Sequence, residues 1–245
     1  MKQNKYDDDV FFEKYSQMDR SKKGLEGSGE WHEFQKLLPD LTGKRILDVG
    51  CGYGWHCRYA MEQGALSAVG IDISEKMLSE AEIRTDSNAV RYICMPIEEI
   101  DFPVNSFDVV ISSLALHYVE SFSDICDKIR RFLVSNGSFV FSVEHPVFTA
   151  EGRQEWHFDE AGNMLHWPVD NYFEEGLRTT NFLGEDVMKY HKTLTTYVNT
   201  LIRSGFEITG LVEPEPEKRI LGMPGMANEL RRPMMLLVSA KKTDK

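Results

Sequence analysis

Apolar and polar positions alternate along the chain in blocks that predict strands and helices in turn. Buried strands are predicted where short apolar runs are bounded by turn residues, namely at 44–49, 68–72, 90–94, 107–112, 138–143, 206–212 and 234–240. Helical spacing of apolar residues predicts helices between them, at 55–63, after Ser74, at 123–133 with Asn136 and Gly137 ending it, and at 195–204. Because strands and helices alternate, we expect an α/β, doubly wound, mostly parallel sheet with helices on both faces.

The spacing of apolar residues within residues 1–40 predicts N-terminal helices that precede this sheet. A helix over 10–19 would place Phe11, Tyr15 and Met18 on one face, and a second helix is predicted over 30–38. Packing of these faces against the core is the simplest interpretation.

Residues 146–185 have little periodicity and carry an unusual number of aromatic residues, including Trp156 and Trp167. A long irregular segment in a compact domain is usually functional or disordered, and the aromatic content argues against disorder. We therefore expect one domain over residues 1–245, with 146–185 inserted as a cap over the active site.

The first predicted strand, 44–49, runs into glycines at alternate positions, Gly50, Gly52 and Gly54. Glycine lets the backbone turn tightly and approach a ligand without a Cβ in the way. Strand, glycine turn and helix form the nucleotide-binding corner of an open α/β sheet. A dinucleotide fingerprint would need a third glycine where this chain has Trp55, which argues against a nicotinamide-dependent oxidoreductase.

Three segments in order, Asp48–Gly54, Gly70–Ser74 and Asn105–Tyr118, carry a resemblance to the class I S-adenosylmethionine-dependent methyltransferases. The resemblance covers roughly 44–145 closely and the C-terminal strands loosely. It implies a Rossmann-like methyltransferase fold with seven strands in the order 3-2-1-4-5-7-6, the last one antiparallel. It also implies S-adenosyl-L-methionine as cofactor and methyl transfer as the reaction.

Asp72 ends the second strand, where its carboxylate can accept hydrogen bonds from both ribose hydroxyls. Asp48 either orders the turn or meets the ligand's ammonium group through water. Ile73 and Met77 either cover one adenine face or belong to the core, and Pro96 stands where many members of the family carry an acid. The cofactor contacts that the resemblance implies are Asp48, Gly50, Cys51, Gly52, Gly54, Asp72, Ile73, Met77, Pro96, Ile97, Glu98, Ser113 and Leu114.

Two histidines, His117 and His145, follow the fourth and fifth strands at their carboxyl ends. Either one can serve as a base if the acceptor must lose a proton, and packing is the alternative role for both. Tyr118 is expected to orient the substrate. Further substrate contacts are expected from Trp156 and Trp167 of the cap and from Tyr15, for which packing and ligand contact are equally open.

The charge balance favours a small-molecule acceptor over nucleic acid, because 39 Asp and Glu outnumber 28 Lys and Arg and give a net charge of −11. No apolar run has membrane-spanning length, and the N-terminus lacks the apolar core of a signal peptide. Four cysteines without a CxxC pair fit reduced thiols in a cytoplasmic protein. The remaining histidines show no ligand spacing, so no metal is expected.

The sequence thus predicts a methyltransferase that moves a methyl group from S-adenosylmethionine to a small molecule. The alternatives are a non-catalytic protein that binds an adenosyl ligand and, less favoured, the oxidoreductase. The acceptor, the element that is methylated, the need for a general base and the oligomeric state stay open.

Overall fold

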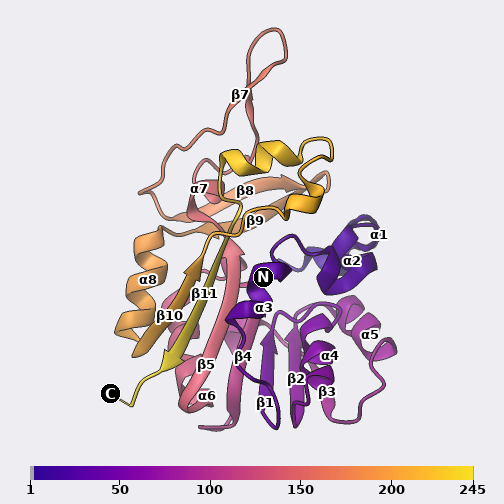
Figure 1. Ribbon diagram of the computed structural model, residues 1–245, viewed down its shortest axis with the longest axis vertical. Helices are drawn as coiled ribbons and strands as arrows, with labels where there is room; N and C mark the ends of the chain where they lie inside the picture. Colours follow the sequence, from indigo (N-terminus) through magenta and orange to yellow (C-terminus); the bar gives the residue numbers. More distant parts are fainter. Residues whose placement is uncertain (1–2, 245) are drawn as a thin grey trace.

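The computed structural model describes residues 3–244, and its centre is a seven-stranded sheet in the order β10-β11-β5-β4-β1-β2-β3 (Figure 1). Strand β11 is antiparallel to both of its neighbours, and the other pairs are parallel. This confirms the expected fold class and strand order. The strands are β1 (Arg45–Val49), β2 (Ser67–Asp72), β3 (Val90–Cys94), β4 (Phe107–Ser113), β5 (Leu133–Glu144), β10 (Phe206–Val212) and β11 (Met235–Lys242).

Helices cover both faces of the sheet, and alternate strand residues divide the core between them. Ile46 packs on the side of α3 (Trp31–Leu37), α4 (Trp55–Glu62) and α5 (Glu75–Ile83). Leu47 packs on the opposite side, with α6 (Phe122–Phe132) and α8 (Leu194–Arg203). Burial on both faces explains why these strands read as continuous apolar runs.

The predicted N-terminal helix over 10–19 is wrong in extent. The chain forms a short turn η1 (Lys5–Asp7), α1 (Asp9–Ser16), α2 (Asp19–Lys23) and a second turn η2 (Gly24–Gly27). Helix α1 ends because the Tyr15 carbonyl accepts hydrogen bonds from the Met18 N–H and the Ser21 hydroxyl, at 3.1 and 2.7 Å. The chain therefore turns back over the carboxyl-terminal edge of the sheet.

The helix predicted over 123–133 begins earlier and ends earlier. Ser121 caps α6 by accepting from the Asp124 N–H at 3.3 Å, and β5 already starts at Leu133, opposite Phe107. Asn136, with φ 59°, and Gly137 therefore lie inside β5 rather than ending the helix. The register between β4 and β5 shifts by three residues here, since Phe107 pairs with Leu133 and Val109 pairs with Ser138, so a bulge in β5 contains Asn136 and Gly137.

The segment over 146–185 is not irregular. It holds α7 (Pro146–Thr149), a hairpin of β6 (His157–Phe158) and β7 (Met164–His166), and most of a second hairpin of β8 (Gly176–Phe182) and β9 (Glu185–His191). The second hairpin turns at Leu183 and Gly184, with φ of 57° and 81°, which suits a two-residue turn. It lies near the carboxyl-terminal edge of the sheet, whereas β6 and β7 extend away from the body (Figure 1).

Candidate functional site

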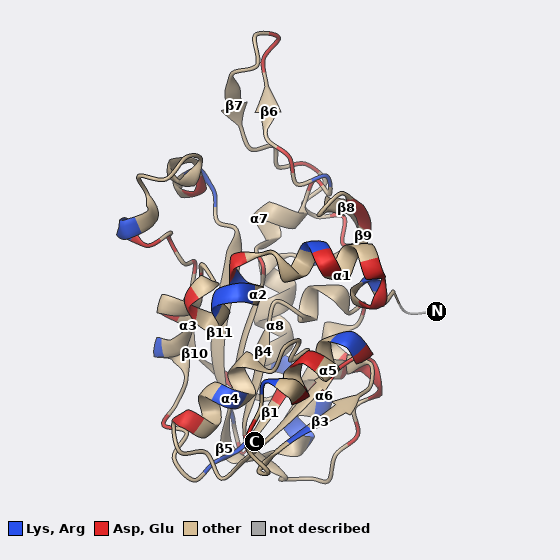
Figure 2. Ribbon diagram, turned by 90° about the vertical axis from the view of Figure 1, so that its right-hand side faces the viewer, with Lys and Arg blue, Asp and Glu red and all other residues tan. Residues whose placement is uncertain are grey.

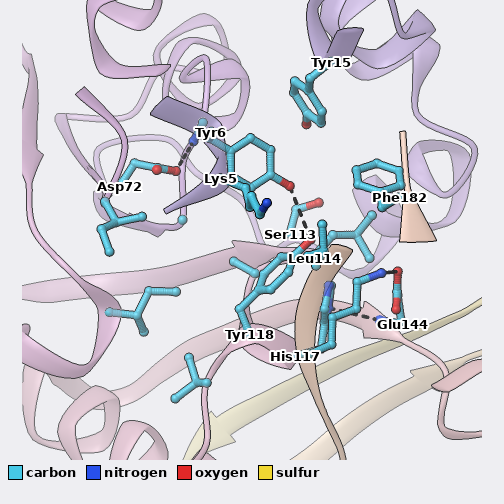
Figure 3. Close-up of a pocket in the computed structure, with 18 of the residues that line it drawn as sticks. Lys5, Tyr6, Tyr15, Asp72, Ser113, Leu114, His117, Tyr118, Glu144 and Phe182 are labelled. Carbon is cyan, nitrogen blue, oxygen red and sulfur yellow. Dashed lines mark hydrogen bonds and ion pairs between the residues drawn. The ribbon is translucent and has the colours of Figure 1, made fainter. Parts of the chain in front are cut away.

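A cavity of about 610 Å³ opens at the carboxyl ends of β1, β2 and β4, where ligands collect in sheets of this kind. Its floor is formed by the residues that end those strands. Its walls are completed by the β8–β9 hairpin and by residues of the N-terminal segment, namely Gln3, Lys5, Tyr6, residues 18–20 and residues 27–30. Figure 3 shows Lys5, Tyr6 and Phe182 of these walls.

Asp72 ties the glycine loop to the neighbouring strand. Its Oδ2 accepts from the Gly52 N–H and its Oδ1 from the Ser74 N–H, both at 2.9 Å. Gly50 and Gly52 line the cavity with φ of 76° and 51°, and a Cβ on Gly50 would lie 2.3 Å from the Ala115 Cβ. The loop therefore requires glycine, and it presents a fixed carboxylate where a ribose would bind.

Three of the expected cofactor residues support the loop from below instead of lining the cavity. Asp48 is fully buried and accepts from the Cys57 thiol at 3.6 Å, and burial raises the pKa of Asp48 to about 7. Cys51 is buried against the preceding turn. Gly54 precedes α4 with φ 69°, and a Cβ there would lie 2.1 Å from the Tyr92 hydroxyl oxygen.

The end of the cavity beside β2 and β3 brings together the side chains predicted from the second and third strands. The turn η3 (Ile97–Glu99) follows β3, and the cavity residues at this end are Ile73, Met77, Pro96, Ile97 and Glu98. An apolar slot bounded by one acid is suited to a flat heteroaromatic ring.

Residues 3–7 cross the cavity, and no pattern in the sequence predicted this. Asp7 accepts from the Ser74 hydroxyl at 2.6 Å and from the Lys76 N–H at 3.1 Å, which satisfies the N-terminus of α5. Gln3 accepts from the Met188 N–H of β9 at 2.8 Å. The same short segment is therefore fixed both beside Asp72 and to the β8–β9 hairpin.

His117 and Tyr118 lie in the turn η4 (Leu116–Tyr118) after β4, with Ser113 and Leu114 beside them on the cavity wall (Figure 3). His117 is 2% exposed, and its Nδ1 accepts from the Glu144 N–H at 3.4 Å, so the ring proton sits on Nε2. Burial lowers the pKa of His117 to about 3.

Tyrosines from distant parts of the chain meet above η4. The hydroxyl oxygens of Tyr6 and Tyr118 are 3.3 Å apart, and the rings of Tyr6 and Tyr15 meet edge to face with centroids 5.1 Å apart (Figure 3). Tyr15 and Tyr118 were expected at the site, and both line the cavity. Tyr6 was missed because no local pattern distinguishes it from a core aromatic residue.

A buried ion pair closes the far end of the cavity. Lys189 of β9 donates to Glu144 Oε1 at 2.6 Å and to Gln154 Oε1 at 3.2 Å, and its ammonium group lies 5.5 Å from the ring centroid of Phe182. Lys189, Glu144 and Phe182 all line the cavity. No local pattern predicts this pair, because 45 residues separate its members along the chain.

The structure does not place His145 or the two tryptophans at the cavity. His145 Nδ1 accepts from the Val147 N–H at 3.0 Å and so caps α7, while its Nε2 lies 2.8 Å from a Glu213 carboxylate oxygen. Trp167 and Trp156 pack edge to face with centroids 5.3 Å apart, and the Arg232 guanidinium lies 4.3 Å from the Trp167 ring. These residues join α7 and the β6–β7 hairpin to the connection between β10 and β11.

Within residues 3–244 no three His, Cys, Asp or Glu side chains are grouped so that they could hold a metal ion. No helix in that range is long and apolar enough to cross a membrane. All four cysteines are free thiols.

Comparisons with known proteins agree with this geometry. A family model described as a methyltransferase domain matches residues 47–141. A solved Listeria monocytogenes protein named an S-adenosylmethionine dependent methyltransferase is 57% identical, with a TM-score of 0.87 over 90% of this chain and 100% of that one. A second, from Mesorhizobium loti, is 43% identical, with a TM-score of 0.83 over 89% of this chain and 100% of that one.

A more distant relative is the tRNA U34 carboxymethyltransferase of Shewanella sediminis, which is 28% identical over 176 residues. The match covers 65% of this chain and 52% of that protein, so this chain spans about half of the relative's length.

Replacing Asp72 with Ala should weaken binding of S-adenosylhomocysteine by at least about tenfold, because a half-buried charged acceptor is lost. Titration calorimetry measures this directly. Asp108→Asn is the matched control, since Asp108 pairs with Arg45 at 2.9 Å at the opposite end of the strands and should leave affinity unchanged. Equal affinities for wild type and Asp72→Ala would contradict the assignment of Asp72 to the ribose.

Proposed function

The chain belongs to the class I S-adenosylmethionine-dependent methyltransferases, and from this premise we propose that its methyl acceptor is a small molecule bound between η4 and the β8–β9 hairpin. The protein is thus an enzyme whose cofactor is S-adenosylmethionine, and the non-catalytic and oxidoreductase alternatives are set aside. The cofactor supplies a methyl group on a sulfonium, which is already a good leaving group. The protein's contribution is then to align the acceptor with that methyl group and to exclude water.

The size of the cavity and the burial of the residues at its acceptor end carry the proposal. Its volume, about 610 Å³, lies in the range of about 300–1,000 Å³ that is typical of small-ligand sites, and the cofactor must occupy part of it. His117 and Lys189 line the acceptor end and are each only 2% exposed, and Gln3 ties the crossing segment to the β8–β9 hairpin. A compact acceptor fits such a chamber better than a folded macromolecule does.

Charge supports the same choice. The chain has a net charge of −11, and Figure 2 shows Lys and Arg interspersed with Asp and Glu in that view rather than gathered on one face. Binding to a polyanion draws on many phosphate contacts from Lys and Arg. The tRNA-modifying relative nevertheless makes tRNA the second candidate acceptor.

No group that we assign to the acceptor end is a good proton acceptor near neutral pH. The pKa of His117 is lowered to about 3 by burial, and the pKa of Tyr118 is raised by burial, so this hydroxyl keeps its proton. Glu144 is held by Lys189, and its pKa lies below the usual value although burial opposes this. We therefore propose that the acceptor reacts through a lone pair that is already free, and that His117 Nε2–H and the Tyr118 hydroxyl orient it.

The acceptor class is tested by measuring S-adenosylhomocysteine release from the purified enzyme with two substrate pools. We expect turnover with a low-molecular-weight cell extract and none with total tRNA, because the cavity has the size of a small-ligand site and the chain has a net charge of −11. The Asp72→Ala variant is the control for enzyme-dependent release. Turnover that requires tRNA and is lost after ribonuclease treatment would refute a small-molecule acceptor.

His117→Ala should lower kcat by about tenfold or more through loss of one oriented donor, whereas His117→Gln, which keeps a side-chain N–H, should lose less. A base role would require the ring to take up the proton, so activity would fall as pH drops through the pKa of His117. Since that pKa is about 3, we expect no His117-dependent limb between pH 5 and 8. An acidic limb near pH 6.5 that disappears in His117→Ala would show instead that this residue is the base.

A further inference from the structure

We propose that Arg20 and Glu30 form the binding site for the zwitterionic amino-acid group of the cofactor. Both residues line the cavity, and both come from the N-terminal segment, where the sequence carries no recognisable cofactor motif. The guanidinium of Arg20 would pair with the α-carboxylate, and the carboxylate of Glu30 would accept from the α-ammonium group.

The two side chains form a nearly buried pair beside the end of β4. Arg20 Nη2 lies 2.6 Å from Glu30 Oε1, and the Ser113 hydroxyl donates to the same oxygen at 3.4 Å. Glu30 is only 2% exposed. Keeping these charges out of water costs free energy. A ligand that gives the two side chains further hydrogen bonds therefore gains more binding free energy from them than it would from exposed charges.

Hydrogen-bonding groups of Glu30 and Arg20 that have no partner within residues 3–244 indicate a ligand. Glu30 Oε2 is buried and has no hydrogen-bond partner within residues 3–244. Both hydrogen bonds of Arg20 in that range leave from Nη2, one to Glu30 and one to the Ser28 hydroxyl at 3.2 Å. A buried carboxylate oxygen without a donor carries a desolvation cost that an incoming ammonium group removes.

The order of the strands places this pair at the correct end of the ligand. Strands β2, β1 and β4 are adjacent in that order, and Asp72 ends β2, Gly50 follows β1 and Ser113 ends β4. A molecule with its ribose at Asp72 and its adenine beyond it, towards β3, must pass over Gly50 and present its other end at Ser113. That end of the cofactor carries the amino acid, and Glu30 stands there.

The alternative role is structural, in which the pair only holds α2 to the segment before α3. Two ligands distinguish the roles, because 5′-methylthioadenosine keeps the adenosine and the sulfur of S-adenosylhomocysteine but lacks the amino-acid group. If the pair binds the amino-acid group, replacing it weakens the affinity for S-adenosylhomocysteine and not for 5′-methylthioadenosine. If the pair is purely structural, replacing it changes the affinity for both ligands to the same extent.

The test is calorimetric titration of both ligands into wild type, Glu30→Gln and Arg20→Lys. We expect each variant to lose at least about tenfold in affinity for S-adenosylhomocysteine and less than about twofold for 5′-methylthioadenosine, since charged hydrogen bonds to one end of the ligand are removed. The matched control is Asp108→Asn, which weakens an ion pair remote from the cavity and should change neither affinity.

Equal losses for the two ligands, or no loss for either, would overturn the proposal. If a variant does not fold, the two ligands can still be compared on the wild-type protein. We expect the wild type to bind S-adenosylhomocysteine at least about tenfold more tightly than 5′-methylthioadenosine. Equal wild-type affinities would also overturn it. Loss of binding of both ligands in Asp72→Ala tests the ribose site separately, so the two assignments can fail independently.

Discussion

The carboxylate of Asp72 is the interaction on which the site depends. It is held before any ligand arrives, because the N–H groups of Gly52 and Ser74 both donate to it at 2.9 Å. Ser74 in turn caps α5 and donates its hydroxyl to Asp7 at 2.6 Å. One half-buried carboxylate therefore links the glycine loop, the second strand, a helix N-terminus and the segment that crosses the cavity.

That linkage explains how one chamber can serve two ligands. The crossing segment is anchored at Asp7 on the cofactor side and at Gln3 on the β8–β9 hairpin, and between them Tyr6 reaches Tyr118 at the acceptor end. The same few residues of the crossing segment would therefore cover both the cofactor and the acceptor. Both ligands would then be held by one connected set of contacts, which suits a reaction that needs alignment more than proton transfer.

Local sequence signals predicted the sheet, the glycine loop and Asp72, because strand burial and loop geometry impose residue types over a few positions. They failed where the determining contact is distant. Trp156 and Trp167 were expected at the active site, but both rings lie against the guanidinium of Arg232, which is 76 and 65 residues away along the chain. In the sequence, nothing distinguishes Glu144 from another polar residue at the end of a strand. Only the folded position of β9 shows that Lys189 pairs with it.

If the N-terminal segment is part of the ligand site, S-adenosylhomocysteine must protect its backbone amides, and hydrogen exchange with and without this ligand measures that protection. We expect the ligand to slow amide exchange in residues 3–8 and in 186–190 as well as in the glycine loop, since these segments are hydrogen-bonded to one another. Slowed exchange confined to the glycine loop and Asp72, with residues 3–8 unchanged, would contradict it.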